Sequence, residues 1–186
     1  NLENLFDTED DKNILDDDFT EDSARNWNTE RYNNKIRKLG KIIKKLGKAN
    51  QSHPPVIVGV AEVENRGVLF DLTNSKHLKE HRYQFIHFDS PDERGIDTAL
   101  LYRENHFTVL ESEAIPLYID NTNGKRDYTR DILYVKGVLE NNVVHILVNH
   151  WPSRRPGFDK TVYKRKAAAV KNRKIISNIL LEDPDA

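Results

Sequence analysis

The 186-residue chain contains no cysteine and no methionine, and it has no long hydrophobic run. The lack of cysteine excludes disulfide bonds, a thiolate nucleophile and a cysteine-ligated zinc site. No segment approaches the roughly 20 apolar residues that a membrane-spanning helix needs, so we predict no membrane span. Because the sequence starts at Asn1 without a methionine, we expect it to be part of a longer protein, whose cellular location is left open.

The overall charge points to no particular partner, because 29 basic residues nearly balance 30 acidic ones. Hydrophobic residues make up 37% of the chain and charged residues 32%, which suits one folded domain with its own core. We therefore expect a single domain over residues 1–186, and we predict no protein partner. Residues 1–22 carry ten carboxylates and one lysine. Such a run is typical of a solvated loop, and calcium binding is the alternative, although the regular alternation and glycine of an EF-hand loop are missing.

The spacing of apolar residues predicts helices near both ends and strands between them. Residues 29–48 combine helical apolar spacing with many lysines, which indicates a helix that covers a sheet. Membrane or nucleic-acid binding is the alternative for this basic helix. A second helix is expected from Asp159, as its N-cap, to about Leu181. The expected strands are residues 56–60, 83–88, 97–102, 107–111, 132–139 and 143–149.

The order of these elements predicts an α+β fold in which two sheets pack face to face and helices flank them. The run at 56–60 is unbroken and apolar, which favours a strand buried on both faces in the middle of the sandwich. Glu62 and Glu64 follow it directly. A carboxylate at the end of such a strand is costly unless it is paired or holds a metal, so both a salt bridge and a site for a hard cation such as Mg²⁺ remain open.

Two further polar groups stand next to predicted strands. The segment Asn149–Arg155 combines an imidazole, an aromatic ring and two guanidinium groups, which favours a phosphate site as much as a structural role. The segment Asp92–Asp97 leads into another strand, and Arg130 stands at the head of a third. There Asp97 could orient an imidazole, and Arg94 and Arg130 could neutralise phosphoryl charge; turn residues and a surface ion pair are the alternative. Residues 154–174 add nine basic side chains beside this region, as expected for an anionic substrate.

Five sequence blocks together resemble the endonuclease/exonuclease/phosphatase superfamily, and most of all its bacterial, deoxyribonuclease-I-like branch. The blocks occur in the family's order and span the chain. They are Asn1–Asp7 (NLENLFD), Gly59–Asn65 (GVAEVEN), Arg94–Tyr102 (RGIDTALLY), Thr129–Asp131 (TRD) and Asn149–Arg154 (NHWPSR). The resemblance implies a four-layered αββα sandwich and divalent-metal-dependent hydrolysis of a phosphodiester or a phosphomonoester.

The resemblance also implies roles for individual residues. Glu62 matches the family's metal-binding glutamate, with Asn1 and Glu3 at further metal-site positions, and the expected ion is Mg²⁺ or Mn²⁺. His150 matches a catalytic histidine that contacts the scissile phosphate, and Arg130 resembles an active-site arginine. The remaining expected site residues are Asp97, in support of His150, and Arg94, Asn149, Trp151 and Arg154, which are expected to bind the substrate phosphate.

The family's later motifs, Gly-Asp-Phe-Asn and Ser-Asp-His, are absent from residues 1–186. We therefore expect the first half to two-thirds of a family domain, cut within the first strand and at the C-terminus, which carries half a catalytic site and is inactive or nearly so alone. The expected activity is that of a metal-dependent phosphoesterase of the nuclease or phosphodiesterase type, with nucleic acid as one candidate substrate. The alternatives are a phosphomonoesterase acting on a small or lipid phosphate and a non-catalytic binding module on the same fold.

Overall fold

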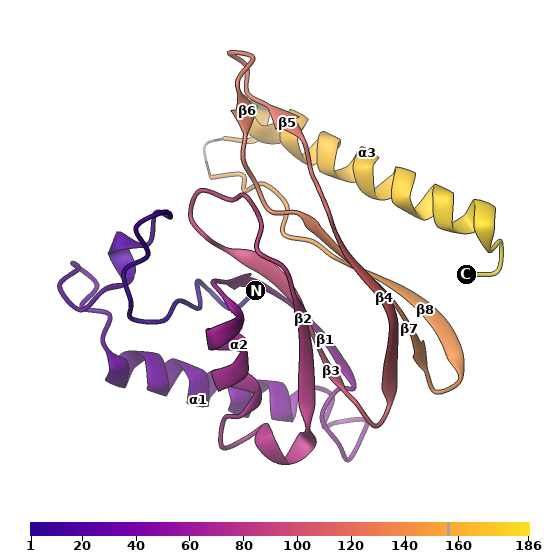
Figure 1. The fold of residues 1–186 in the computed structure, drawn as a ribbon, viewed down its shortest axis with the longest axis horizontal. Coiled ribbons are helices and arrows are strands. Elements are labelled where there is room, and N and C mark those ends of the chain that lie inside the picture. The colour runs from indigo at the N-terminus through magenta and orange to yellow at the C-terminus, as the bar shows by residue number, and fades with distance from the viewer. Residues whose placement is uncertain (156) are drawn as a thin grey trace.

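The computed structural model describes residues 1–155 and 157–186, and it places two antiparallel sheets face to face between helices (Figure 1). The strands of the first sheet, in spatial order, are β1 (Ile57–Val63), β3 (Asp97–Arg103) and β2 (Tyr83–His87). Those of the second sheet are β4 (Phe107–Ile115), β7 (Ile132–Leu139) and β8 (Asn142–Val148). Between β4 and β7 the chain forms a two-stranded hairpin of β5 (Ile119–Asp120) and β6 (Arg126–Asp127).

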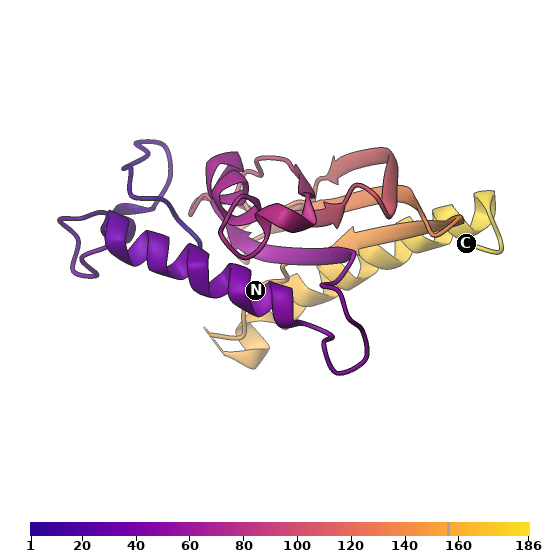
Figure 2. The same ribbon diagram turned by 90° about the horizontal axis from the view of Figure 1, so that it is seen from below.

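Helices cover the outer faces of both sheets (Figures 1 and 2). The first sheet is covered by α1 (Thr29–Lys45) and α2 (Arg66–Thr73), whose N-cap residues Asn28 and Asn65 accept backbone hydrogen bonds from Arg31 and Val68. The second sheet is covered by the 25-residue α3 (Phe158–Glu182). Two short 3₁₀ helices, η1 (Asp17–Phe19) and η2 (Lys79–His81), complete the elements.

The alternation of side chains along β3 explains the layering. Ala99 and Leu101 belong to a core cluster with residues of α1 and α2, whereas Leu100, between them, belongs to a second cluster with Phe107 and Val135 of the other sheet. A strand with apolar residues on both faces needs a covering layer on each side. The expected fold, a four-layered αββα sandwich, is confirmed.

Three details of the expected elements are wrong. The middle strand of the first sheet is β3 and not residues 56–60; β1 lies beside it, and Gly59 is exposed. Helix α3 begins at Phe158 with Gly157 as its N-cap, and Asp159 lies inside the first turn, where its charge still favours the helix. Helix α2 and the hairpin strands β5 and β6 were not predicted, because eight- and two-residue elements are too short to show a periodic pattern.

The acidic N-terminal segment is only partly the solvated loop that its charge predicts. Leu5, Phe6 and Asp16 are buried, and Leu5 forms a parallel bridge with Val63 of β1. The apolar residues between the carboxylates therefore tie this segment to the first sheet. Within the described residues, none of the helices is long and apolar enough to cross a bilayer.

Candidate functional site

A cavity of about 620 Å³ lies at one end of the sandwich. Its walls come from the N-terminal segment, the end of β1, the loop between β2 and β3, the segment between β6 and β7, the residues after β8 and the first turns of α3. Four of the residues singled out from the sequence line it together: Glu62, Arg94, Arg130 and His150. Segments from both halves of the chain thus meet around one hollow.

Glu62 reaches the cavity because β1 contains a bulge at this position. The pairing of β1 with β3 runs from Ala61 directly to Val63, so Glu62 is the extra residue. Its backbone is left-handed, with φ at 61°, a conformation that is rare outside glycine and that concentrates at functional sites. The bulge re-aims the carboxylate away from the regular faces of the strand.

The N-terminal segment holds Glu62 in this position. The Asn4 backbone N–H donates to Oε2 of Glu62 at 2.9 Å, and the Leu5 N–H donates to the Glu62 carbonyl oxygen at 2.8 Å. Lys35 of α1 donates from Nζ to the carbonyl oxygens of Glu3 and Asn4. Helix α1, predicted only as a cover for the sheet, therefore also fixes the backbone that binds the Glu62 carboxylate.

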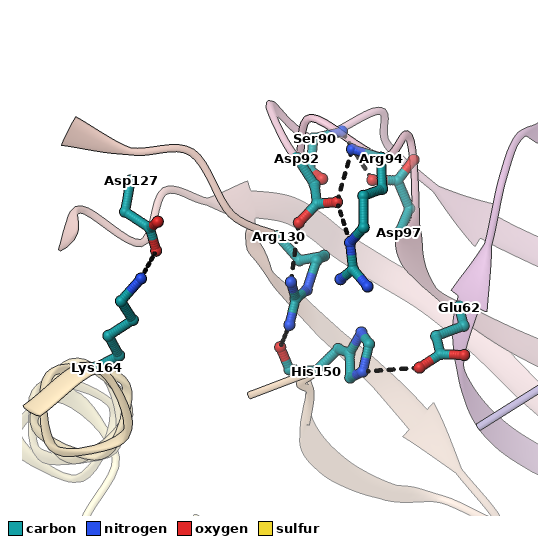
Figure 3. Close-up of polar contacts among 9 residues, drawn as sticks. All are labelled: Glu62, Ser90, Asp92, Arg94, Asp97, Asp127, Arg130, His150 and Lys164. Carbon is teal, nitrogen blue, oxygen red and sulfur yellow. Dashed lines mark hydrogen bonds and ion pairs between the residues drawn. The ribbon is translucent and has the colours of Figure 1, made fainter. Parts of the chain in front are cut away.

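His150 lies against Glu62 at the far wall of the same cavity. Its Nε2 is 3.3 Å from Oε1 of Glu62, and both side chains are largely buried (Figure 3). Burial is the main cause that lowers the pKa of His150 to about 4; Arg130 and Arg94 act in the same direction, and Glu62 opposes them. The imidazole is therefore neutral near pH 7. Because a carboxylate oxygen only accepts, the contact favours the tautomer with the proton on Nε2.

Arg130 joins His150 to the loop between β2 and β3. Its guanidinium donates to Oδ2 of Asp92 at 2.8 Å and to the carbonyl oxygen of His150 at 2.8 Å, and both charged side chains are buried. Asp92 also accepts the Arg94 backbone N–H and lies 3.4 Å from Arg94 Nε. Arg94 is half-exposed and extends from this loop toward the His150 ring (Figure 3). The result is a fixed positive wall opposite Glu62.

The loop that carries Asp92 and Arg94 depends on Gly95. Its φ is +62°, its N–H closes a turn onto the Asp92 carbonyl oxygen, and an added Cβ would meet Ile14 at 2.3 Å. Glycine is the residue that adopts this conformation without strain, and here it also leaves room for Ile14. The Arg-Gly pair noticed in the sequence thus places the guanidinium of Arg94 at the cavity.

Helix α3 contributes the last wall of the cavity. Lys164 pairs with Asp127 of β6 at 2.9 Å (Figure 3). Thr161 of the helix and Arg155, which precedes the helix, also line the hollow. Lys164 and Arg155 belong to the basic stretch that the sequence placed beside the site. The cavity therefore gathers cationic groups from three separate segments.

Several predicted site residues lie elsewhere. Asn1 and Glu3 line a different cavity, between α1 and β1, and Asn4 takes the place beside Glu62. Asp97 does not contact His150: its carboxylate accepts from the His87 ring and from the Ser90 N–H, both at 3.0 Å. The prediction that Asp97 supports His150 does not agree with this placement. Asp97 leaves β3 on the face shared with His87 of the neighbouring strand, which explains the pairing.

The predicted phosphate-binding residues after β8 also turn away from the cavity. Asn149 exchanges hydrogen bonds with Asn172 of α3, and Trp151 donates from Nε1 to Asn149. The Arg154 guanidinium lies over the ring of Phe158, 5.8 Å from its centroid. Asn149 thus links α3 to the end of the second sheet, Trp151 bonds to Asn149, and His150 between them contacts Glu62.

Asp92, Asn4 and Lys164 are not among the site residues expected from the sequence, whereas Arg155 is one of the two guanidinium groups of the predicted phosphate segment Asn149–Arg155. A signal existed for Asp92, since a carboxylate in the Asp-Glu-Arg-Gly turn precedes a buried strand and needs a partner. Lys164 was part of the basic stretch that was noted. Asn4 binds through its backbone, and no side-chain pattern could have indicated it.

The cavity fits a divalent cation held by a single carboxylate. Of the acidic groups that line it, Asp92 pairs with Arg130 and Asp127 with Lys164, and Glu93 is exposed to solvent, whereas Glu62 faces the neutral ring of His150. Mg²⁺ commonly takes one or two carboxylates and completes its coordination with water and substrate phosphate. Outside the cavity, His87, Asp89 and Asp97 form a group whose potential metal-ligating atoms lie within 4.8 Å of one another.

Glu64 lies outside the cavity and yields a pH-dependent prediction. It is buried, accepts the Asp7 N–H at 2.7 Å, and burial raises its pKa to about 8 from an ordinary 4.5. Between these values the native state keeps a proton that the unfolded state has lost, so stability falls as the pH rises from about 4.5 to about 8.

We expect Glu64→Gln to remove this loss, because the amide has no proton to release. At pH 9 the variant should exceed the parent in unfolding free energy by on the order of a few kcal/mol, with a much smaller difference at pH 5. Urea unfolding at both pH values, in EDTA, measures this. Parallel pH profiles for the two proteins would contradict the assignment.

Comparisons with known proteins agree with this architecture. The profile described as "Endonuclease/Exonuclease/phosphatase family" matches residues 1–186. The human Nocturnin catalytic domain with bound sulfate is similar at 20% identity and a TM-score of 0.53, over 80% of this chain and 53% of that one. TDP2 from Caenorhabditis elegans is 18% identical with a TM-score of 0.60, over 86% of this chain and 41% of that one.

An endonuclease/exonuclease/phosphatase from Bacteroides vulgatus is also similar, at 18% identity and a TM-score of 0.52, over 90% of this chain and 58% of that one. Identities this low indicate a common fold. The chain spans about half the length of these three solved structures. No curated protein matches it.

Proposed function

We propose that this chain, which belongs to the endonuclease/exonuclease/phosphatase family, contributes to the catalytic site of a divalent-metal-dependent phosphoesterase. One observation carries the proposal: Glu62 and His150, 88 positions apart in the sequence, lie 3.3 Å apart in a cavity with a positive wall. Removing an ionisable carboxyl group and an ionisable imidazole from water costs free energy, and such pairs in a cavity are found most often at functional sites.

The substrate in this proposal is a phosphodiester bound by the positive wall. The exposed part of the Arg94 guanidinium would donate to phosphate oxygens, a geometry to which a planar guanidinium is suited. Arg130 is a positioning residue, because Asp92 and the His150 carbonyl oxygen already engage its two terminal nitrogens. Its charge, buried next to the cavity, would still stabilise negative charge that develops on the phosphoryl group.

His150 would act in its neutral form. Its Nε2–H can donate a hydrogen bond to a phosphate oxygen that takes the place of Glu62 beside the ring, or the ring can relay a proton by taking one up at Nδ1 as it releases the one on Nε2. Its buried Nδ1 has no hydrogen-bond partner among the described residues, so a second polar contact at the ring is available. Glu62 would hold Mg²⁺ or Mn²⁺, which supplies Lewis-acid polarisation of the phosphoryl oxygen when bound.

We also propose that residues 1–186 form only part of the catalytic site. In support, the chain spans about half the length of the family structures it resembles. Of the carboxylates that line the cavity, Asp92 and Asp127 have cationic partners and Glu93 is exposed, so among the described residues Glu62 is the one largely buried carboxylate left for a metal. We expect the protein in its natural length to hydrolyse phosphodiesters, and residues 1–186 alone to be inactive or nearly so.

The test is an assay of the natural-length protein on bis-p-nitrophenyl phosphate, p-nitrophenyl phosphate and plasmid DNA, with Mg²⁺, with Mn²⁺ and with EDTA. We expect metal-dependent hydrolysis of the diester substrates. Activity that survives EDTA would refute the metal requirement. Hydrolysis of the monoester alone would indicate a phosphomonoesterase, and no hydrolysis of any substrate would indicate a non-catalytic binding module.

A further inference from the structure

The β5–β6 hairpin next to the cavity has two chemically different faces. Side chains alternate between buried and exposed along both strands, as they do in any strand with one covered face. The buried face consists of Leu117, Ile119, Asp127 and Thr129, and the exposed face of Tyr118, Asp120, Arg126 and Tyr128. Two tyrosines and an arginine are therefore presented to solvent together.

The buried face fixes the hairpin to α3. Leu117 and Ile119 pack with Ala168 of α3 in a small apolar cluster, and Asp127 pairs with Lys164 of the same helix at 2.9 Å. Figure 1 shows the hairpin lying along the first turns of α3. The exposed face thus has a rigid support, which is needed for a surface that positions a ligand.

On the exposed face, the Arg126 guanidinium lies over both tyrosine rings. Its Cζ is 4.5 Å from the Tyr118 ring centroid and 4.7 Å from that of Tyr128. The tyrosines nevertheless remain 65% and 47% exposed. The Arg126 cation holds the two rings in place and leaves a large part of each ring accessible. Neighbouring aromatic side chains that stay exposed to water commonly mark a binding surface.

This face continues directly into the cavity. Tyr128 lines the hollow together with Arg130, which follows it by two residues, and Lys164 and Arg155 line it as well. Asp120, the acidic side chain of the face, lies opposite Arg126 in the hairpin register and so on the side of the turn, away from Tyr128 and the cavity. Arg94 and Tyr128 line the same cavity, so a ligand whose phosphate binds Arg94 has Tyr128 on the wall of the same hollow.

We propose that Tyr118, Arg126 and Tyr128 form a stacking surface for the bases of a single-stranded nucleic acid whose phosphate lies in the cavity; this inference rests on the phosphoesterase function proposed above. Bases stack on tyrosine rings and on guanidinium planes whatever their sequence, and nearby cationic groups attract the backbone. The turn at the end of the hairpin, Asn121–Lys125, consists of polar residues and glycine, which does not suit insertion into a lipid layer.

The experiment measures binding without hydrolysis. The natural-length protein, in EDTA, is titrated into a short fluorescein-labelled single-stranded oligodeoxynucleotide, and fluorescence anisotropy gives Kd. A second probe is an oligonucleotide of equal length made of abasic residues. The variants are Tyr118→Ala/Tyr128→Ala, which removes both rings, and Tyr118→Phe/Tyr128→Phe, which keeps them. Neither variant touches Glu62, His150 or Arg94.

We expect the alanine variant to bind the oligonucleotide at least roughly 5- to 150-fold more weakly, which is the effect of losing one base stack, and a larger loss if both rings carry a base. The phenylalanine variant should bind as the parent does, and both variants should bind the abasic probe as the parent does. Unchanged binding of the oligonucleotide by the alanine variant would overturn the proposal, and so would an equal loss for the abasic probe. Failure of the parent to hydrolyse any phosphate ester would refute the proposed function and leave this binding result unaffected.

Discussion

His150→Ala in the natural-length protein is expected to lower kcat on a phosphodiester by about 10²–10⁴-fold, the usual contribution of a positioned proton-transfer group. The imidazole contacts the Glu62 carboxylate, Arg130 holds the His150 backbone through its carbonyl oxygen, and the ring is neutral near pH 7 because burial lowers its pKa. Its loss removes a donor at the place where phosphoryl charge develops. Steady-state kinetics with bis-p-nitrophenyl phosphate and Mg²⁺ measure the effect.

His106→Ala is the matched control for this variant. His106 lies in the turn between β3 and β4 and contacts Glu140, which lies in the turn between β7 and β8. These turns are outside the cavity, so the removal of the His106 ring should leave kcat unchanged. The Arg130 guanidinium binds the backbone of His150 and not its ring, so the fold around His150→Ala should persist; its urea midpoint checks this. If a folded His150→Ala protein turned over the substrate at the parent's rate, the role proposed for the imidazole would be refuted.

Arg130→Met is expected to lower the free energy of unfolding by up to about 3–5 kcal/mol, the cost of removing one member of a buried ion pair, because Asp92 then keeps only the half-exposed Arg94, whose Nε lies 3.4 Å away. Asp92 is 6% exposed and Arg130 7%, so in the variant the Asp92 carboxylate stays largely shielded from water. The hydrogen bond to the His150 carbonyl oxygen is lost as well. Urea unfolding monitored by circular dichroism gives the difference.

Two comparison variants separate the buried charge from other effects. In Asp92→Asn/Arg130→Met the unpaired carboxylate is gone, so most of the lost stability should return, while activity should stay low because the positive wall is missing. Arg25→Met breaks a surface pair with Asp18 and should cost no more than about 1 kcal/mol. A double variant as unstable as Arg130→Met alone would show that the ion pair is not the source of the loss.

Much of the fold could be predicted because its signals are local. The apolar runs that became β3 and β7 are buried in the structure as their composition requires, and the periodic basic segment became α1. The hairpin and α2 were missed because elements of two to eight residues carry no period. The assignment of 56–60 as the middle strand failed because strand order depends on pairing partners far away in the chain.

The candidate site shows the same division. Glu62, Arg94, Arg130 and His150 could be named from the sequence because charged and titratable groups next to buried strands are costly and therefore conspicuous. Their neighbours Asn149 and Asp97 looked equally suitable, and the structure pairs them with Asn172 and His87. A residue type and its position do not reveal which way a side chain leaves its strand.

The order of residues was thus sufficient to establish the layers of this protein and the kinds of chemical group near its candidate site, because hydrophobic patterning acts over a few neighbouring residues. Three-dimensional packing was needed to establish the bulge that aims Glu62 at His150, the burial that keeps His150 neutral, and the backbone contacts that hold Glu62 and Arg130. These properties depend on distances and on exclusion of water between segments that are remote in the sequence, and such quantities exist only once the chain has folded.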